Sequence, residues 1–152
     1  MRCVRLLAAV APLLLVALAA CGAAGDGGGV AGDAAGGGAA GTGDAALARA
    51  FEAQASDLEV EGRGTVVRVL ADDDEGARHQ RFVIRLDSGQ TLLVAHNIDV
   101  APRVDGLAEG DVIAFRGVYE WSAEGGTVHW THRDRAGVHA AGWLRRGGRV
   151  YE

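Results

Sequence analysis

The stretch Gln80–His96, QRFVIRLDSGQTLLVAH, contains two runs in which apolar and polar residues alternate. The runs are Gln80–Asp87 and Gln90–His96, and Ser88 and Gly89 separate them. Alternation with a period of two places the apolar side chains of a strand on one face, and a short turn containing glycine joins antiparallel neighbours. The stretch therefore predicts a β-hairpin with one buried face.

The residues on both sides of this hairpin predict three further strands. These are Gly64–Leu70, Asp111–Trp121 and Thr127–His132, and each is bounded by glycine or acidic turn residues. In the long strand Asp111–Trp121, one set of residues alternates with polar or smaller residues and is expected to face the core. The members of this set are Ile113, Phe115, Tyr119 and Trp121.

The order of the five predicted strands indicates an all-β fold of the OB type. The chain has three strands, then an irregular connection at Val100–Gly110, then a further hairpin. This order is expected of a small five-stranded OB-like barrel in which the usual helix is reduced to that connection. Closure of the barrel would remove exposed strand edges. A small β-sandwich or an open sheet is the alternative that this pattern leaves open.

A short helix and a linker are predicted before the barrel. Ala45–Ala55 has apolar residues at helical spacing, and Asp44 is a suitable N-cap. The preceding stretch Gly22–Gly43 consists mostly of glycine and alanine, a composition that cannot bury enough surface to offset the entropy of ordering. We therefore expect a flexible linker over residues 21–43 and one folded domain over residues 44–152.

The first twenty residues have the layout of a secretory signal. Arg2 and Arg5 precede the apolar run Leu6–Leu18, which is shorter than the roughly 20 residues that a membrane-spanning helix needs. The run ends in LAAC at Leu18–Cys21, a sequence typical of a bacterial lipoprotein signal. Residues 1–20 are therefore predicted to be cleaved and Cys21 to carry the lipid. The chain would then be anchored to a membrane of the cell envelope, facing the periplasm in a Gram-negative cell. An ordinary cleaved signal with an incidental cysteine is the alternative.

The composition excludes several kinds of chemistry. All 15 basic residues are arginine, so lysine nucleophiles and lysine Schiff bases are absent. Cys3 lies in the predicted signal and Cys21 is the predicted lipid site, which leaves no thiol for catalysis or disulfide bonding. The net charge is −5 and becomes more negative without Arg2 and Arg5. A general nucleic-acid-binding role is therefore disfavoured.

All five histidines lie between positions 79 and 139, which suggests a metal site. Imidazole is a common ligand of zinc and other divalent transition metals. The candidate ligands are His96, His129, His132 and His139. Because His129 and His132 have opposite parity on a strand, both could reach one ion only if the strand ends or bulges between them. The alternative is that these histidines hold loops through hydrogen bonds to the backbone.

A basic stripe is predicted on the solvent face of the strand Gln80–Asp87. His79, Arg81 and Arg85 share parity there, and the outer face of this part of an OB barrel commonly receives the ligand. Together with Trp130 these residues are candidate contacts for a small anionic ligand, a peptide or a sugar acid. An ordinary solvated face whose arginines pair with nearby acids is the alternative.

A catalytic role has weaker support in the sequence. A faint resemblance to the carboxylate and arginine arrangement of staphylococcal-type nucleases is found at Asn97, Asp99 and Arg103. Glu120 is a conceivable base. A metal-dependent hydrolase is therefore the enzymatic alternative. The chain has no Gly-x-Ser-x-Gly elbow, no phosphate-binding loop and no Cys–His pair. The favoured interpretation is a binding or accessory module of the cell envelope, whose partner is an envelope protein or a small anionic ligand.

Several runs of the sequence are similar to those of a known family. These runs are DDDEGARHQRF at Asp72–Phe82, LLVAHNIDVAPR at Leu92–Arg103, GVYEW at Gly117–Trp121, GGTVHWTH at Gly125–His132 and GWL at Gly142–Leu144. Together they resemble DUF3465, a family of small bacterial proteins of unknown function. The resemblance extends over about Leu47–Glu152, and HWTH is its most distinctive motif. Ser122, Arg135 and Glu152 depart from the pattern, but they lie in turns and at the end of the chain. The resemblance implies membership of this family and implies no activity.

Overall fold

The computed structural model describes residues 40–152, so the predicted signal, Cys21 and most of the predicted linker lie outside the described residues. The described part is mostly strand. Its elements are α1 (Ala40–Glu52), β1 (Leu58–Val69), β2 (His79–Leu86), β3 (Thr91–Asn97), β4 (Val112–Glu120), β5 (Thr127–His129), β6 (Trp143–Arg146) and β7 (Arg149–Tyr151). Over this range no helix is both long enough and apolar enough to cross a lipid bilayer.

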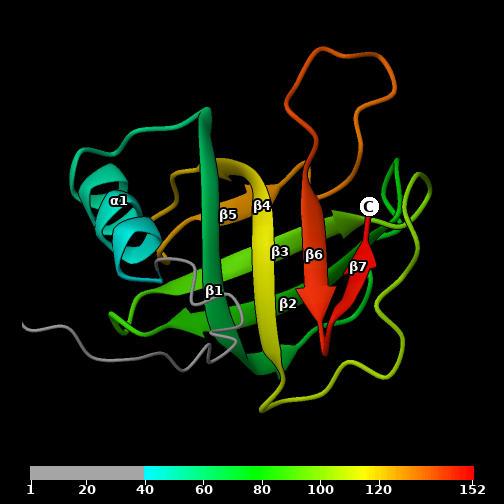
Figure 1. Cartoon of the computed structure of the whole chain (residues 1–152), viewed down its shortest axis with the longest axis horizontal. Coiled ribbons are helices and arrows are strands. Elements are labelled where there is room, and N and C mark those ends of the chain that lie inside the picture. Colours follow the sequence, from blue (N-terminus) through cyan, green and yellow to red (C-terminus); the bar gives the residue numbers. More distant parts are fainter. Residues whose placement is uncertain (1–39) are drawn as a thin grey trace, which may run out of the picture. The chain divides into compact units, whose positions relative to one another are not determined.

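Five of these strands form a closed barrel, which confirms the predicted all-β, OB-like fold (Figure 1). Going round the barrel, β1 pairs with β2, β2 with β3, β3 with β5, β5 with β4, and β4 again with β1. The β3–β5 pair is parallel and the other four are antiparallel. The alternatives of a sandwich and an open sheet are therefore wrong.

β1 closes the barrel because it is long enough to pair on two sides. Leu58–Thr65 lies against β4, and Gly64–Val69 lies against β2. The register shifts between Val66 and Arg68, where a bulge bends the strand from one partner to the other. The sequence-based prediction began this strand at Gly64 and missed its first half, whose mostly exposed side chains include glutamates.

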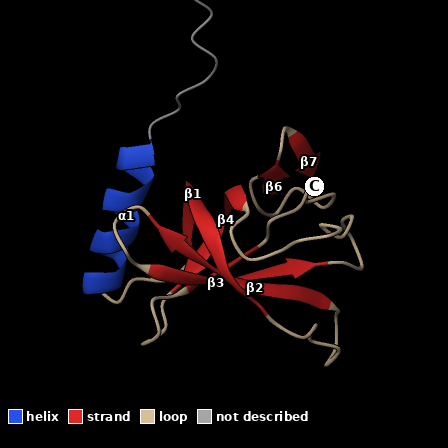
Figure 2. Ribbon diagram, turned by 90° about the horizontal axis from the view of Figure 1, so that it is seen from below, coloured by secondary structure: helices blue, strands red, loops and turns tan. Residues whose placement is uncertain are grey.

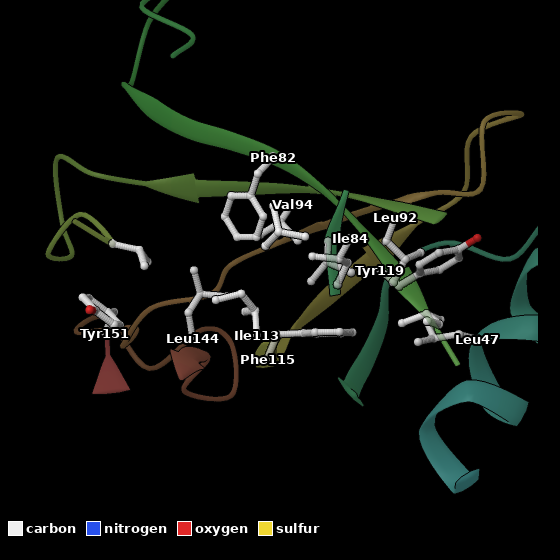
Figure 3. Packing of buried hydrophobic residues seen from close by; sticks show 14 of the residues in the cluster. Leu47, Phe82, Ile84, Leu92, Val94, Ile113, Phe115, Tyr119, Leu144 and Tyr151 are labelled. Carbon is white, nitrogen blue, oxygen red and sulfur yellow. The ribbon is translucent and has the colours of Figure 1, made fainter. Parts of the chain in front are cut away.

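Apolar side chains from the barrel strands and from β6 fill the interior (Figure 3). The fully buried ones include Phe82, Ile84, Leu92, Val94, Ile113, Phe115, Tyr119 and Leu144. Burial of each such side chain contributes about 1.5–3 kcal/mol to stability. The predicted core face of β4 is confirmed for Ile113, Phe115 and Tyr119. Trp121, just after β4, is only half-buried and packs against Phe51, with 6.5 Å between the ring centroids.

The helix α1 covers one end of the barrel core. Leu47 and Ala50 are its buried apolar residues, and Leu47 points toward Tyr119 and Leu92 (Figure 3). In both views of the whole chain, α1 and the β6–β7 hairpin lie on opposite sides of the barrel (Figures 1 and 2). The helix therefore seals the end of the core that the hairpin leaves uncovered.

The bounds of α1 differ from the prediction. The helix spans Ala40–Glu52 instead of Ala45–Ala55. Asp44 is therefore inside the helix and is not its N-cap. Its buried carboxylate accepts a hydrogen bond from the backbone N–H of Ser88 at 3.1 Å, which ties α1 to the turn between β2 and β3.

The hairpin of β6 and β7 was not predicted. β6 pairs with β4 at Ala114–Arg116, beside the stretch of β4 that pairs with β5. The two strands are only four and three residues long, and three of their seven residues are arginines, so they are too short to show an alternating pattern. Leu144 and Tyr151 nevertheless contribute buried side chains to the core.

We expect Gly126→Ala to destabilise the barrel much more than Gly89→Ala. Both glycines have a positive φ, 108° at Gly126 and 89° at Gly89, so alanine strains the backbone at either position. A Cβ at Gly126 would also overlap the ring of Tyr119, whereas a Cβ at Gly89 meets nothing within 4 Å. Urea unfolding should show a loss of about 1 kcal/mol for Gly89→Ala and about 3 kcal/mol or more for Gly126→Ala. Equal losses would contradict the packing of the β4–β5 turn on Tyr119.

Candidate functional site

Three strand ends meet at one rim of the barrel. Because β3 and β5 run parallel, their last residues, Asn97 and His129, lie at the same end. β2 is antiparallel to β3 and begins at this end, where His79 pairs with Asn97. Figure 1 shows the arrowhead of β3 beside the start of β2. Polar side chains from three separate parts of the chain are therefore brought together.

A groove, which we call the rim groove, crosses the outer surface at these strand ends. It is a hollow of about 210 Å³ lined by His79, Ala95, Asn97, His129, Trp130 and His132. Two larger hollows share its walls. One of about 370 Å³ extends toward Glu120 and Thr127, and one of about 470 Å³ extends toward residues 133–136. Ala95 lies on β3 between β2 and β5, and its small side chain leaves the hollow open.

Trp130 follows β5 in a left-handed backbone conformation. Its φ is 53°, which a bulky residue rarely adopts and which costs about 1–3 kcal/mol. On a continuous strand, the side chains of His129 and His132 would point to opposite faces. Because β5 ends at His129, this alternation does not extend to His132, and both histidines line the rim groove. Gly142 permits this path, because a Cβ there would overlap the carbonyl oxygen of Trp130.

The indole of Trp130 lies among three imidazoles. Its ring centroid is 4.2 Å from that of His139, 5.5 Å from that of His132 and 6.1 Å from that of His129. These contacts hold the ring at the border between two of the hollows. The indole thus presents a fixed apolar surface with a single N–H donor.

His96 has a structural role at the rim. Its side chain is fully buried, and its Nε2–H group donates to the carbonyl oxygen of Pro102 at 3.0 Å. Nδ1 then accepts a hydrogen bond from the hydroxyl group of Thr131 at 2.8 Å. Burial lowers the pKa of His96 to about 4, although the bond to Pro102 opposes the change. The neutral ring therefore joins β3, the connection after it and the segment after β5.

His129 has unused hydrogen-bonding capacity. Its Nε2 atom is buried, has no hydrogen-bond partner in the part of the chain that the structure describes, and lies 3.6 Å from Oε1 of Glu120. That distance exceeds a normal hydrogen bond. Burial lowers the pKa of His129, although the charge of Glu120 opposes the change. The ring is therefore neutral at pH 7.

The predicted zinc ligands His96, His129, His132 and His139 do not converge on one point. His96 uses both ring nitrogens within the protein, and Nδ1 of His132 donates to the carbonyl oxygen of Arg133 at 2.9 Å. Within residues 40–152, no group of three or more His, Cys, Asp or Glu side chains is placed to hold a metal ion. The structure thus gives the four-histidine metal site no support.

The predicted basic stripe is divided by the structure. His79 and Trp130 line the rim groove. Arg81 lies next to His79 along β2 and forms an ion pair with Asp73 at 3.7 Å. Arg85 is exposed near the other end of β2, away from the rim. These residues therefore do not form one continuous binding surface, and a role for each in binding stays a prediction.

The charged residues suggested for a hydrolase take part in ion pairs. Arg103 pairs with Asp72 at 2.5 Å, and the hydrogen bond from Arg103 lowers the pKa of that carboxyl. Asp99 accepts hydrogen bonds from the backbone N–H and the side chain of Arg78, which lower its pKa. Both pairs join the β1–β2 connection to the β3–β4 connection, so they hold the rim together.

Two groove residues had no predicted role. Ala95 contributes through the small size of its side chain, and Thr127 contributes through its position beside β3. Neither residue carries a signal in the sequence. Only the parallel pairing of β3 with β5, which the sequence pattern does not specify, places them at the groove.

The sequence was compared with known proteins. Residues 35–152 match the sequence model of a family described as "Protein of unknown function (DUF3465)". The match includes all of the strands described above. No curated protein matches the chain.

We expect a loss of stability in acid that depends on His96. The pKa of this histidine is about 4 in the folded protein and about 6.5 when unfolded, so the unfolded state binds the proton first as the pH falls. Stability is therefore lost between pH 6.5 and pH 4, by about 3 kcal/mol in total. Urea unfolding across this range should show a shallower pH dependence for His96→Gln than for the wild type.

His139→Gln serves as the control for this experiment, because it retains the titration of His96 and of His129, whose pKa is also lowered by burial. An NMR titration of the wild-type imidazole gives the pKa of His96 directly. A normal pKa there, or an unchanged pH dependence in His96→Gln, would contradict the buried neutral ring.

Proposed function

The chain belongs to the DUF3465 family, whose description assigns no activity, and we propose from its geometry that the barrel is a binding module whose ligand occupies the rim groove. One observation carries the proposal. Strand ends from three parts of the chain build a hollow whose polar groups are only partly satisfied within the protein. Nε2 of His129 is the clearest case, since it is buried beside Glu120 without a hydrogen-bond partner in the described residues.

The position of the groove supports a binding role. In OB barrels, the outer face of the second and third strands and the loops beside it receive the ligand. The rim groove lies on this face, at His79 of β2 and at Ala95 and Asn97 of β3. The backbone strain at Trp130 also supports the proposal, because residues held in rarely populated conformations cluster at functional sites.

Binding is better supported than metal-dependent hydrolysis. The carboxylate of Asp99 and the guanidinium group of Arg103 each have an ion-pair partner within the protein. Groups paired in this way are poorly placed to hold a metal ion and to stabilise charge on a reacting phosphate. The neutral imidazole of His129, which offers one donor and one acceptor, is instead suited to recognition.

The proposed module would act at the cell envelope, anchored through Cys21. The support is the signal-like sequence of residues 1–20 and the cysteine that follows it. The glycine- and alanine-rich stretch Gly22–Gly43 would act as a flexible tether. Such a tether would let the barrel reach a ligand or an envelope protein away from the membrane surface.

We expect Ala95→Leu to block the rim groove. Leucine fills the hollow beside His129 without removing a polar group, and a substitution at the surface of a strand changes stability by only about 0.5 kcal/mol. Amide NMR spectra of the full-length protein should show small polar fragments from a screening library shifting the signals of Ala95, Asn97 and His129. These shifts should disappear in the Ala95→Leu variant.

The matched control is Ala114→Leu. Ala114 is another half-buried alanine on the outer face of the barrel, but it lies on β4 between Arg63 and Arg145 and outside the groove. Fragment binding should survive in this variant. Fragments that bind elsewhere, or that still shift the same signals in Ala95→Leu, would overturn the proposed site.

We expect Cys21→Ser to release the protein from the membrane fraction, because serine cannot carry the thioether-linked lipid of a lipoprotein. Cys3→Ser is the matched control and should remain in the membrane fraction, since Cys3 lies in the part of the signal that is removed. Fractionation of cells followed by immunoblotting measures both. Retention of the Cys21→Ser variant in the membrane fraction would defeat the proposed anchor.

A further inference from the structure

Two of the arginines beside the rim groove are paired within the protein. Arg81 pairs with Asp73 at 3.7 Å and also donates to the backbone carbonyl of Ala71 at 3.2 Å. Arg133, at the far end of the groove, pairs with Glu152. Charges that are paired in this way attract phosphate groups weakly. Proteins that bind single-stranded nucleic acid need the opposite arrangement, a groove with a continuous row of free positive charge.

Arg135 stands at the outer end of the groove, in the hollow that residues 133–136 line. Carboxylates of Asp99 and Asp134 line the same hollow, and Glu120 lies at the opposite end of the groove. The floor of the groove therefore carries a mixed and nearly balanced set of charges. Such a set selects against polyanions, because every anionic group would also meet a carboxylate.

The groups on the groove floor match hydroxyl groups. A hydroxyl group donates one hydrogen bond and accepts others, and a neutral imidazole also offers one donor and one acceptor. His129 is neutral because it is half-buried and its pKa is lowered. Nδ1–H of His132 donates to the carbonyl oxygen of Arg133, so Nε2 is the ring nitrogen that can face a ligand. The amide of Asn97 and the carboxylate of Glu120 add further polar atoms.

Trp130 supplies the apolar part of the site. Its backbone conformation and its packing against His132 and His139 hold the indole in place, so binding costs little conformational entropy. The ring borders two hollows. A flat aromatic surface next to hydrogen-bonding groups suits a ligand with an apolar face and a polar edge. A pyranose ring has this character, with C–H groups on its face and hydroxyl groups around its edge.

We infer that the rim groove binds a neutral oligosaccharide, with one sugar ring against the indole of Trp130 and hydroxyl groups paired with His129, Asn97 and Glu120. The inference rests on the proposed binding role of the groove and names the class of its ligand. OB barrels use this face for oligonucleotides or oligosaccharides, and the paired arginines together with the carboxylates along the groove favour the oligosaccharide. Three adjoining hollows suit a chain of several rings better than a single sugar.

The test uses the purified full-length protein and four neutral tetrasaccharides: chitotetraose, cellotetraose, maltotetraose and mannotetraose. At least one should shift the amide signals of Ala95, Asn97 and His129 and the indole N–H signal of Trp130 in a saturable way. Trp130→Asn should weaken this binding about ten-fold, because asparagine accepts the left-handed backbone conformation but lacks the ring. Trp143→Asn, which removes a half-buried tryptophan of β6 that stacks with Arg145, should leave the affinity unchanged.

Two anionic probes, tetragalacturonate and a twelve-residue oligothymidylate, separate the outcomes. Groove shifts caused by an anionic probe and by none of the neutral sugars would overturn the oligosaccharide inference and leave the binding role standing. Groove shifts caused by library fragments but by no tetrasaccharide would do the same. A groove that responds to neither fragments nor oligomers would overturn the binding role together with the inference. Equal weakening in Trp130→Asn and Trp143→Asn would remove Trp130 from the site.

Discussion

The parallel pairing of β3 with β5 is the contact on which the barrel and its groove both depend. Leu93 lies opposite Thr127, and Val94 lies opposite Val128, so two short stretches join the first three strands to the last two of the barrel. A parallel pair needs a long crossover, and β4 with its connections supplies it. The same pairing sets His129 beside β3, where the side chains are small enough to leave a hollow. Closure of the core and assembly of the groove are therefore consequences of one strand pairing.

The rim stays in one arrangement because buried and charged contacts tie its connections together. His96 joins β3 to Pro102 and Thr131, which lie in two different connections. Its buried ring has both nitrogens satisfied, so the large penalty for an unpaired buried polar group is avoided. One of its partners, Thr131, directly follows Trp130, which takes the strained conformation. The strain persists because the surrounding contacts fix the backbone on both sides of Trp130.

The sequence pattern was sufficient for elements whose alternation is strong. The hairpin Gln80–His96 and the core face of β4 follow from alternation of apolar and polar residues, and the number and order of the strands led to the OB-like barrel. The first half of β1 and the β6–β7 hairpin were missed, because exposed glutamates and arginines leave little apolar periodicity there. The described residues give the four-histidine metal site no support, and the reason is a different one. Clustering of histidines along the sequence does not show which nitrogens are free, and His96 had already used both of its own.

The sequence pattern placed Arg81 and Arg85 on one face of β2 and suggested that arginines bind an anionic ligand. In the structure, arginines have a different role. Near the rim, arginines mostly hold connections: Arg103 joins Asp72, and Arg78 joins Asp99. Exposed ion pairs of this kind contribute little to stability individually, about 0–1 kcal/mol. Their effect on the surface is larger, because each pair removes a free charge from the rim. The groove is lined by imidazoles, an amide and an indole, with the carboxylate of Glu120 and the guanidinium group of Arg135 at its two ends. The proposed recognition at this surface would therefore depend on hydrogen bonding and stacking, with little contribution from long-range attraction of charged ligands.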